Sequence, residues 1–491
     1  MLFMSMSVFG QPGFIKAYDA SVSDKAWFQD MLIDNDTIVL YSIAWDDDGV
    51  QGIRFLKMDS LGQVLQAQFF ADTTDVLSFT VFRKKIIKTS DGGYAICGGT
   101  AKLIADPYLL KVNHQLELEV LKKYPSGKNT AQSSLLEMSD GGFMLLCWEV
   151  DGVRQPVVIR TDKNGVELWR KSYISSGVKS SSTTIKKIGD NRYLILANRG
   201  ELVPFPNPSK WGHGYFIEID SLGNKNWDYE LSGSDGIDVI WDCDVLDDGG
   251  MVCVGGSWEE MPSSPGSYTS RPQIFRLDVN YDIIWQHIYS GYYTFQFFRQ
   301  MVKTSEGNYI ASGNIPSGSW DSMKGVHLKF TPAGDELWMR LDSVYPTYNI
   351  FWKTEITGTG LLSSGSIISI GSATNATGPY GFMMKLSPNG CIDTLNCWLV
   401  ATGPAIPDTR QALSVYPNPA ADYVVLSKAG GFFRKGAEIQ WIDGLGRTID
   451  RVFPQGDKIR MEVAAWPSGI YFYRYLLDGR EMDSGRILVD E

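Results

Sequence analysis

The stretch Thr89-Ser-Asp-Gly-Gly-Tyr-Ala-Ile-Cys-Gly98 sets the architecture of this chain, because the chain repeats it. An Asp-Gly-Gly turn followed by alternating apolar residues is typical of a tight β-hairpin, since glycine adopts the positive φ that the turn requires. Clear copies begin at Ser139, Asp247 and Ser305, and a weaker copy begins at Gly189. The repetition predicts a series of similar hairpins along the chain.

A second phrase, Asp-x-x-Gly-x-x-x-Trp, follows the hairpin in several repeats. Its two full copies end at Trp169 and Trp227, and variants end at Trp285 and Trp338. The hairpin recurs about every fifty to sixty residues, and each repeat contains four strand-like stretches. Seven repeats of four antiparallel strands predict an all-β fold, a seven-bladed β-propeller, in which we expect the tryptophan to pack between blades.

The first strand-like stretch, residues 14–18, resembles the end of a repeat rather than its beginning, because Phe14 and Tyr18 align with Trp169 and Tyr173. The seventh repeat has three clear strands and no good fourth one. We therefore expect residues 14–18 to pair with the third strand of that repeat, near 380–386, and to close the ring, with Phe14 in the position that Trp169 occupies in its own repeat.

A length of 491 residues predicts more than one domain or a large repeat array. We expect the propeller at residues 11–400, a Pro-rich linker at 401–409 and a small immunoglobulin-like β-sandwich at 410–491. Residues 1–10 are apolar and end in a small-residue pattern typical of a signal-peptide cleavage site, but no basic segment precedes it. They are interpreted as a signal-peptide remnant whose true start lies upstream; the alternative is a buried first segment.

The composition excludes several classes of function. The apolar fraction of 44% is that of a globular protein, and 50 glycines favour strands and turns. The net charge of -11 repels phosphate backbones, so nucleic acid is not an expected partner. No apolar run reaches the roughly 18 residues of a membrane-spanning helix.

The C-terminal stretch carries three short motifs in a fixed order: a Tyr-Pro-Asn-Pro head, a central Asp-x-x-Gly-Arg and a late Gly-Ile-Tyr. In their order, spacing and position they resemble the type A C-terminal sorting domain of bacterial type IX secretion substrates. The resemblance implies passage to the periplasm, docking on an outer-membrane translocon, and a secreted or cell-surface product. The residues that carry it are Tyr416, Pro417, Asn418, Pro419, Asp443, Gly446, Arg447, Gly469, Ile470 and Tyr471.

Candidates for chemistry are few. The four histidines lie in different repeats without metal-ligand spacing, and no phosphate loop, dinucleotide fingerprint or nucleophile elbow occurs, so no metal site and no cofactor are expected. Asp238, Asp242 and Asp244 alternate with apolar residues, which predicts that their carboxylates share one strand face. If that strand is innermost in its blade, they line the channel mouth as ligand-binding residues and can bind Ca²⁺; otherwise the face is merely solvated.

Six cysteines are sparse for this length. Cys391 and Cys397 bracket a stretch short enough to close as a disulfide in an exported protein, and we expect this bond. Cys243 and Cys253 flank one Asp-Gly-Gly turn. They either meet across that hairpin or serve as two small buried apolar residues.

These observations predict an exported or cell-surface protein whose propeller binds a glycan or a protein, rather than an enzyme. The alternative is a secreted hydrolase or lyase that acts on polysaccharide with channel-mouth carboxylates. Two carboxylates at a glycosidase-like separation would favour the enzyme, whereas an aromatic, carboxylate-poor surface would favour binding.

Overall fold

The structure is a computed structural model in which all described elements are β-strands. The described residues are 13–18, 27–46, 48–78, 86–102, 104–151, 153–173, 180–199, 213–231, 239–260, 268–289, 297–316, 323–344, 353–375, 378–392, 413–416, 419–428, 433, 436–443, 447–454, 456, 458–477 and 480–490. Among these residues no helix is long and apolar enough to cross a membrane. The chain divides into two compact units, Met1–Pro404 and Ala405–Glu491.

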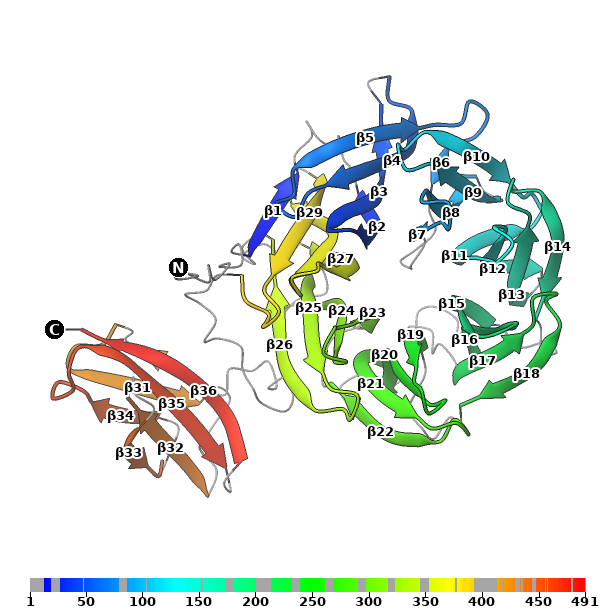
Figure 1. Cartoon of the computed structure of the whole chain (residues 1–491). Helices are drawn as coiled ribbons and strands as arrows, with labels where there is room; N and C mark the ends of the chain where they lie inside the picture. The colour runs from blue at the N-terminus through cyan, green and yellow to red at the C-terminus, as the bar shows by residue number, and fades with distance from the viewer. Residues whose placement is uncertain are drawn as a thin grey trace, which may run out of the picture. The chain divides into compact units, whose positions relative to one another are not determined.

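The first unit is a β-propeller, with blades of four or five strands arranged around a central axis (Figure 1). A parallel pairing of Met323 with Lys353 joins the last two blades into one eight-stranded sheet. In blade one, β2 (Trp27–Asp34) lies nearest the centre, followed outward by β3 (Thr37–Trp45), β4 (Gln51–Met58) and β5 (Val64–Phe70). Blades three, four and five repeat this order. Blade three comprises β11 (Asn129–Glu137), β12 (Phe143–Asp151), β13 (Val153–Thr161) and β14 (Glu167–Ser172). Blade four comprises β15 (Ser180–Gly189), β16 (Arg192–Arg199), β17 (His213–Ile219) and β18 (Lys225–Glu230). Blade five comprises β19 (Val239–Val245), β20 (Met251–Glu260), β21 (Tyr268–Leu277) and β22 (Ile283–Ile288).

Blade two differs in that two short strands take the innermost position, both paired with β8. Its strands are β6 (Leu77–Ser78), β7 (Ile86–Lys88), β8 (Tyr94–Thr100), β9 (Pro107–Val112) and β10 (Leu118–Lys123). Blade six comprises β23 (Phe297–Lys303), β24 (Tyr309–Pro316), β25 (Met323–Phe330) and β26 (Glu336–Asp342). Blade seven comprises β27 (Lys353–Leu361), β28 (Ile367–Asn375), β29 (Gly378–Leu386) and β1 (Phe14–Tyr18).

The ring is closed by the N-terminal strand, as the sequence predicts. β1 pairs antiparallel with β29, and the register runs from Phe14 opposite Lys385 to Tyr18 opposite Gly381 (Figure 1). Strands from both ends of the unit therefore complete blade seven through backbone hydrogen bonds. This pairing also protects the outer edge of β29.

The repeated hairpin turn forms for the reason that the sequence suggests. In blade two, Gly92 has a φ of 88°, and its N–H donates to the carbonyl of Thr89 at 2.9 Å. The N–H of Thr89 in turn donates to the carbonyl of Gly93 at 2.9 Å. Only glycine adopts this φ without steric cost, so the glycine fixes the place at which the chain reverses.

Six innermost strands contain a β-bulge near their first residues. The sequence does not reveal this feature. A bulge bends the strand and directs a side chain or carbonyl away from the ladder. At two of these bulges the freed groups bind the next blade: the Ser133 hydroxyl donates to the Ser182 carbonyl at 3.0 Å, and the Thr357 hydroxyl donates to the Phe28 carbonyl at 2.9 Å. The inserted residues are Gln29, Ser133, Thr183, Trp241, Arg299 and Thr357.

The second unit is a two-sheet β-sandwich. One sheet has the order β30-β31-β34 and the other the order β33-β32-β35-β36. Its core is apolar and aromatic, with Trp441 fully buried between Tyr473 and Trp466. The strands are β30 (Leu413–Tyr416), β31 (Tyr423–Lys428), β32 (Ala437–Ile442), β33 (Thr448–Val452), β34 (Lys458–Glu462), β35 (Gly469–Leu477) and β36 (Arg480–Val489).

Candidate functional site

Asp242 and Asp244, two of the three acidic residues proposed for the channel mouth, lie on β19, the innermost strand of blade five. Asp242 is buried, and its carboxylate accepts hydrogen bonds from the backbone N–H of Cys243 at 3.0 Å and of Met301 at 3.1 Å. The ammonium of Lys186 lies 2.7 Å from the same carboxylate. Burial opposes the charge of Lys186, but Asp242 holds the pKa of Lys186 above its ordinary value. Because Lys186 belongs to blade four and Met301 to blade six, Asp242 links three blades.

Asp244 also contacts a neighbouring blade. Its carboxylate accepts a hydrogen bond from the Tyr309 hydroxyl at 2.7 Å and lies 3.3 Å from the Lys303 ammonium. Asp34 of blade one makes the same pair of contacts, with Tyr94 at 2.8 Å and Lys88 at 2.7 Å. The recurrence of this contact in two places indicates a structural role between blades.

The predicted common face of these carboxylates depends on an unbroken alternation. A bulge between Ile240 and Asp242 interrupts that alternation at Trp241. Asp238 itself lies outside the described residues. Within the described parts of the chain, no group of three His, Cys, Asp or Glu residues is arranged to hold a metal ion.

The Asp-x-x-Gly turns join neighbouring blades at the outer rim. The hydroxyl of Tyr173, at the end of β14, donates to the carbonyl of Gly223 in the turn of blade four at 3.0 Å. Trp169 covers the same glycine so closely that a Cβ placed on Gly223 would lie 2.5 Å from the indole. Trp285 and Trp338 approach Gly334 and Gly390 in the same way. The tryptophans therefore pack between blades, as predicted.

The rim between blades four and five departs from this pattern. At the position of the turn glycine stands Tyr281, whose φ is 69° although it is not a glycine. Leu116, in the corresponding turn of blade two, has a similar φ of 61°. Blade one carries Gln66 where other blades have the tryptophan, so the buried Leu116 side chain fills the space that a tryptophan ring would occupy. Blade four does carry its tryptophan, Trp227, and two large side chains therefore meet at this rim.

Trp227 and Tyr281 pack together with Tyr229 as an aromatic cluster at this rim. The ring centroids of Tyr281 and Trp227 are 5.0 Å apart, and those of Tyr281 and Tyr229 are 5.1 Å apart at an interplanar angle of 27°. Tyr229 remains 37% exposed. We refer to Trp227, Tyr229 and Tyr281 as the rim platform.

Polar groups hold the rim platform in place. The indole N–H of Trp227 donates to the Glu218 carboxylate at 2.9 Å, and the Arg192 guanidinium donates to the same carboxylate at 2.8 Å. Arg192 holds the pKa of Glu218 below its ordinary value. Burial, with a further contribution from Glu218, raises the pKa of Tyr281 to about 12, so the phenol stays protonated at neutral pH. Sequence reasoning missed this site, although the Tyr of Asp278-Val-Asn-Tyr281 marks it as an exception among the turns.

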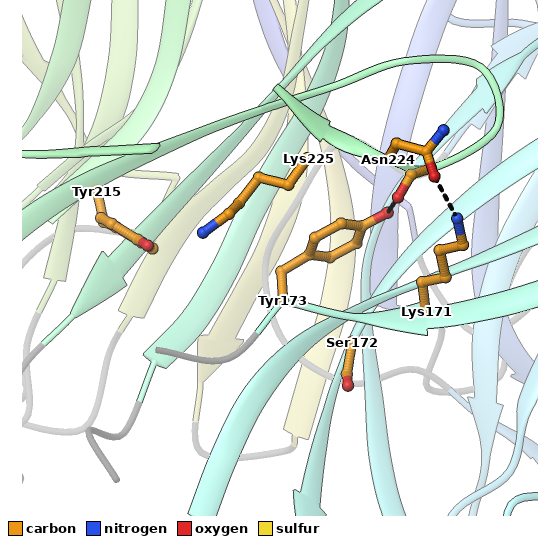
Figure 2. Close-up of a pocket in the computed structure, with 7 residues that line it drawn as sticks. Lys171, Ser172, Tyr173, Tyr215, Asn224 and Lys225 are labelled. Atoms are coloured by element: carbon orange, nitrogen blue, oxygen red, sulfur yellow. Dashed lines mark hydrogen bonds between the residues drawn. The ribbon is translucent and has the colours of Figure 1, made fainter. Parts of the chain in front are cut away.

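A groove of about 400 Å³ lies on the opposite face of blade four, at its rim with blade three. Figure 2 shows Lys171 and Tyr173 on one side and Asn224 and Lys225 on the other. Lys171 donates to Asn224 at 3.0 Å, and Lys225 pairs with Asp228 at 3.1 Å. Lys171 and Tyr173 therefore bind the facing turn of blade four, whereas Lys225 pairs within its own strand.

In the second unit, the motif residues that the structure describes have structural contacts. Arg447 donates from its backbone N–H and its guanidinium to Asp443 at 2.9 and 2.7 Å, which closes the turn between β32 and β33. The buried Tyr471 donates to the Pro467 carbonyl at 2.8 Å, whereas Ile470 is 48% exposed. Tyr416 and Pro419 are exposed, and Gly469 begins β35. Pro417, Asn418 and Gly446 lie outside the described residues.

The predicted Cys391–Cys397 bond stays a prediction, because Cys397 lies outside the described residues. Cys391 is buried just after blade seven. Cys97, Cys147, Cys243 and Cys253 are buried and have free thiols in this structure.

Comparison with known proteins identifies the second unit. Residues 414–488 match the family described as the secretion system C-terminal sorting domain. The chain therefore ends in a type IX sorting domain, which marks a protein that is secreted or attached to the cell surface and which implies interaction with the type IX secretion machinery. No curated protein is significantly similar to this chain.

Several solved structures are similar to the chain at low identity. One is PorZ, a surface component of the type IX secretion system of Porphyromonas gingivalis, at 10% identity over 94% of this chain and 70% of that one, with a TM-score of 0.30. Another is the β-propeller domain of the Trilobed protease from Pyrococcus furiosus, at 10% identity over 73% of this chain and 95% of that one, with a TM-score of 0.39. A third is the polysaccharide lyase Uly1, at 8% identity over 73% and 90%, with a TM-score of 0.44.

Proposed function

We propose that the propeller of this exported protein is a glycan-binding module and that the rim platform is its binding surface. The observation that carries the proposal is the conformation of Tyr281. A non-glycine residue at a φ of 69° costs about 1–2 kcal/mol relative to glycine, and five of the seven equivalent turns have glycine there. Leu116 has the same backbone conformation but is fully buried, whereas Tyr281 supports the exposed ring of Tyr229. Backbone strain beside an exposed aromatic surface is typical of functional sites.

The chemistry of the platform suits a sugar. A pyranose ring has an apolar C–H face that stacks on an aromatic ring, and hydroxyl groups at its edge that need hydrogen-bond partners. Tyr229 offers an exposed ring supported from behind by Tyr281, and the Tyr281 phenol and the Arg192 guanidinium lie nearby. Binding sites of this kind combine aromatic surface with a few oriented polar groups.

Binding is better supported than catalysis. A glycoside hydrolase or lyase needs acidic groups that are available to the substrate, commonly a pair of carboxylates. Asp242 and Asp244, the candidates for that role, are engaged by Lys186 and by Tyr309 and Lys303 of other blades. Removing either carboxylate from those contacts would weaken the packing of the blades.

The test is a polysaccharide and oligosaccharide array probed with the protein collected from outside the cell. We expect binding to a defined set of glycans and its loss, by at least tenfold, in Tyr229→Ala. The matched control is Leu168→Ala, an exposed apolar residue on the equivalent outer strand of blade three. The absence of glycan binding, or equal loss in both variants, would overturn the proposal; capture of a protein ligand instead would assign the platform to protein recognition.

A further inference from the structure

Cys243 and Cys253 stand directly opposite one another on β19 and β20. At the turn of this hairpin, the N–H of Leu246 donates to the carbonyl of Gly250 at 2.8 Å, so these two residues form a hydrogen-bonded pair. Hydrogen-bonded and non-hydrogen-bonded pairs alternate along an antiparallel ladder. Counting outward through Val245 and Asp244 makes Cys243 and Cys253 a non-hydrogen-bonded pair.

This position has the geometry that a disulfide needs. Residues opposite each other in a non-hydrogen-bonded pair have Cα atoms about 4.5 Å apart and side chains close together. A disulfide joins Cα atoms that are roughly 4.4–6.8 Å apart. The bulge at Trp241 lies beyond Cys243 and does not disturb the register between Cys243 and the turn.

The surroundings favour reaction between the two thiols. Both side chains are fully buried in the core between blades four and five, beside Leu194 and Phe216. A hydrogen bond from Cys253 holds the pKa of the Cys243 thiol below its ordinary value, although burial opposes this, and Lys186 contributes in the same direction. Burial raises the pKa of Cys253. Cys243 is thus the better nucleophile of the pair.

We propose that Cys243 and Cys253 form a cross-strand disulfide in the exported protein. The inference rests on export, which the sorting domain shows, and not on glycan binding. Export takes the chain into an oxidising compartment, where facing thiols are oxidised.

The chemistry is thiol–disulfide exchange with a disulfide donor, such as a periplasmic thiol oxidoreductase. The Cys243 thiolate attacks one donor sulfur, which forms a mixed disulfide and releases the other donor sulfur as a thiolate. The Cys253 thiolate then displaces the first donor sulfur. Two protons and two electrons leave the protein, and the donor disulfide is reduced to two thiols. Because both sulfurs are buried, the exchange takes place before blade five closes against blade four.

The test is mass mapping of the full chain recovered from outside the cell. The protein is unfolded in an alkylating agent without reductant and then digested. We expect a peptide pair that contains Cys243 and Cys253, lighter by two hydrogens than the two thiol peptides. Cys147, which faces Gln132 and Val157, should be alkylated and serves as the internal control. Alkylation of both Cys243 and Cys253, or a link from either to another cysteine, would overturn the proposal.

A second measurement does not depend on peptide recovery. Cys253→Ala should lower the melting temperature of exported protein by about 2–5 °C more than Cys147→Ala, because only the first removes a crosslink. The same two variants made and folded under reducing conditions should differ by less than 1 °C or so. If the difference in melting temperature between the two variants were the same in exported and in reduced protein, the proposed disulfide would be contradicted. In the mass mapping, a Cys391–Cys397 link would join peptides other than those that contain Cys243 and Cys253, so it does not affect the test of this bond.

Discussion

The hydroxyl of Tyr18 donates a hydrogen bond of 2.8 Å to the carbonyl of Gly62, so the strand that closes the ring also binds the turn of the next blade. Tyr124 and Tyr173 make the same contact to Gly165 and Gly223, at 2.9 and 3.0 Å. The contact between blade seven and blade one, where the ring closes, therefore has the same hydrogen bond as the contacts between consecutive blades. β1 is a full member of blade seven.

Deletion of residues 11–19 should consequently destabilise the propeller far more than loss of a free tail. It removes the ladder to β29 and the Tyr18 contact, and it exposes an unpaired strand edge. We expect a fall in melting temperature of more than about 5 °C, measured by calorimetry. The control is Tyr18→Phe, which removes only one hydrogen bond, worth about 1 kcal/mol. A deletion variant as stable as Tyr18→Phe would show that β1 does not hold the ring.

Much of this fold follows from the sequence, because its turns require particular residues. The repeated glycines locate the hairpins, and the aromatic residues of 14–18 identify a fourth strand separated from its blade. Phe14 was expected to take the position of Trp169, and its ring lies 3.6 Å from a Cβ placed on Gly62. Its smaller size leaves room for Met383 at the same glycine.

The remaining features depend on contacts between distant residues. The bulge at Trp241 has no local sequence cause, so period-two reasoning does not anticipate it. The shared face of Asp238, Asp242 and Asp244 stays a prediction, because Asp238 lies outside the described residues. The roles of Asp242 and Asp244 are set by Met301 and Tyr309, which lie about sixty residues away. The rim platform forms because Trp227 of blade four meets Tyr281, which replaces the usual turn glycine of blade five. The two residues belong to different repeats, so neither repeat alone predicts their contact.

Gly223→Ala tests the packing of tryptophan between blades. Gly223 has a φ of 74°, and a new Cβ would lie 2.5 Å from Trp169. We expect a loss of about 2–4 kcal/mol in the free energy of unfolding, from backbone strain and from displacement of the indole. Gly92→Ala is the matched control: its φ is 88° but nothing lies within 4 Å, so it should lose only about 1–2 kcal/mol. Equal losses would mean that Trp169 moves aside freely.

Glu336 should make the stability of the propeller depend on pH. Burial raises the pKa of Glu336 to about 7, and a hydrogen bond with Tyr289 opposes that shift. The folded state then holds the proton more tightly than the unfolded chain, whose glutamate pKa is about 4.3. This contribution is fully present below about pH 4.3 and is lost as pH rises through about 7.

Glu336→Gln should remove that dependence. Measured by urea unfolding, the variant should match the wild type near pH 4 and exceed its stability by about 1 kcal/mol at pH 8, an amount reduced by the partial exposure of the side chain. An unchanged slope in Glu336→Gln would rule out this assignment.

Deletion of residues 410–491 tests the export route. The two units are compact separately, so the truncated chain should fold and accumulate in the periplasm instead of outside the cell. Cell fractionation with an antibody against the propeller gives the distribution. Normal release of the truncated protein would show that the C-terminal unit is dispensable for secretion.

The central claim, that the propeller binds a glycan through the rim platform, is tested most directly by Tyr281→Gly. This change gives the turn the glycine of its counterparts, so relief of a positive φ offsets the lost ring contacts, and the melting temperature should stay within about 3 °C of the wild type. Isothermal titration with a glycan retained on the array should show a loss of affinity of at least tenfold in this variant, while Leu168→Ala binds normally. Unchanged affinity in a folded Tyr281→Gly protein would contradict the account.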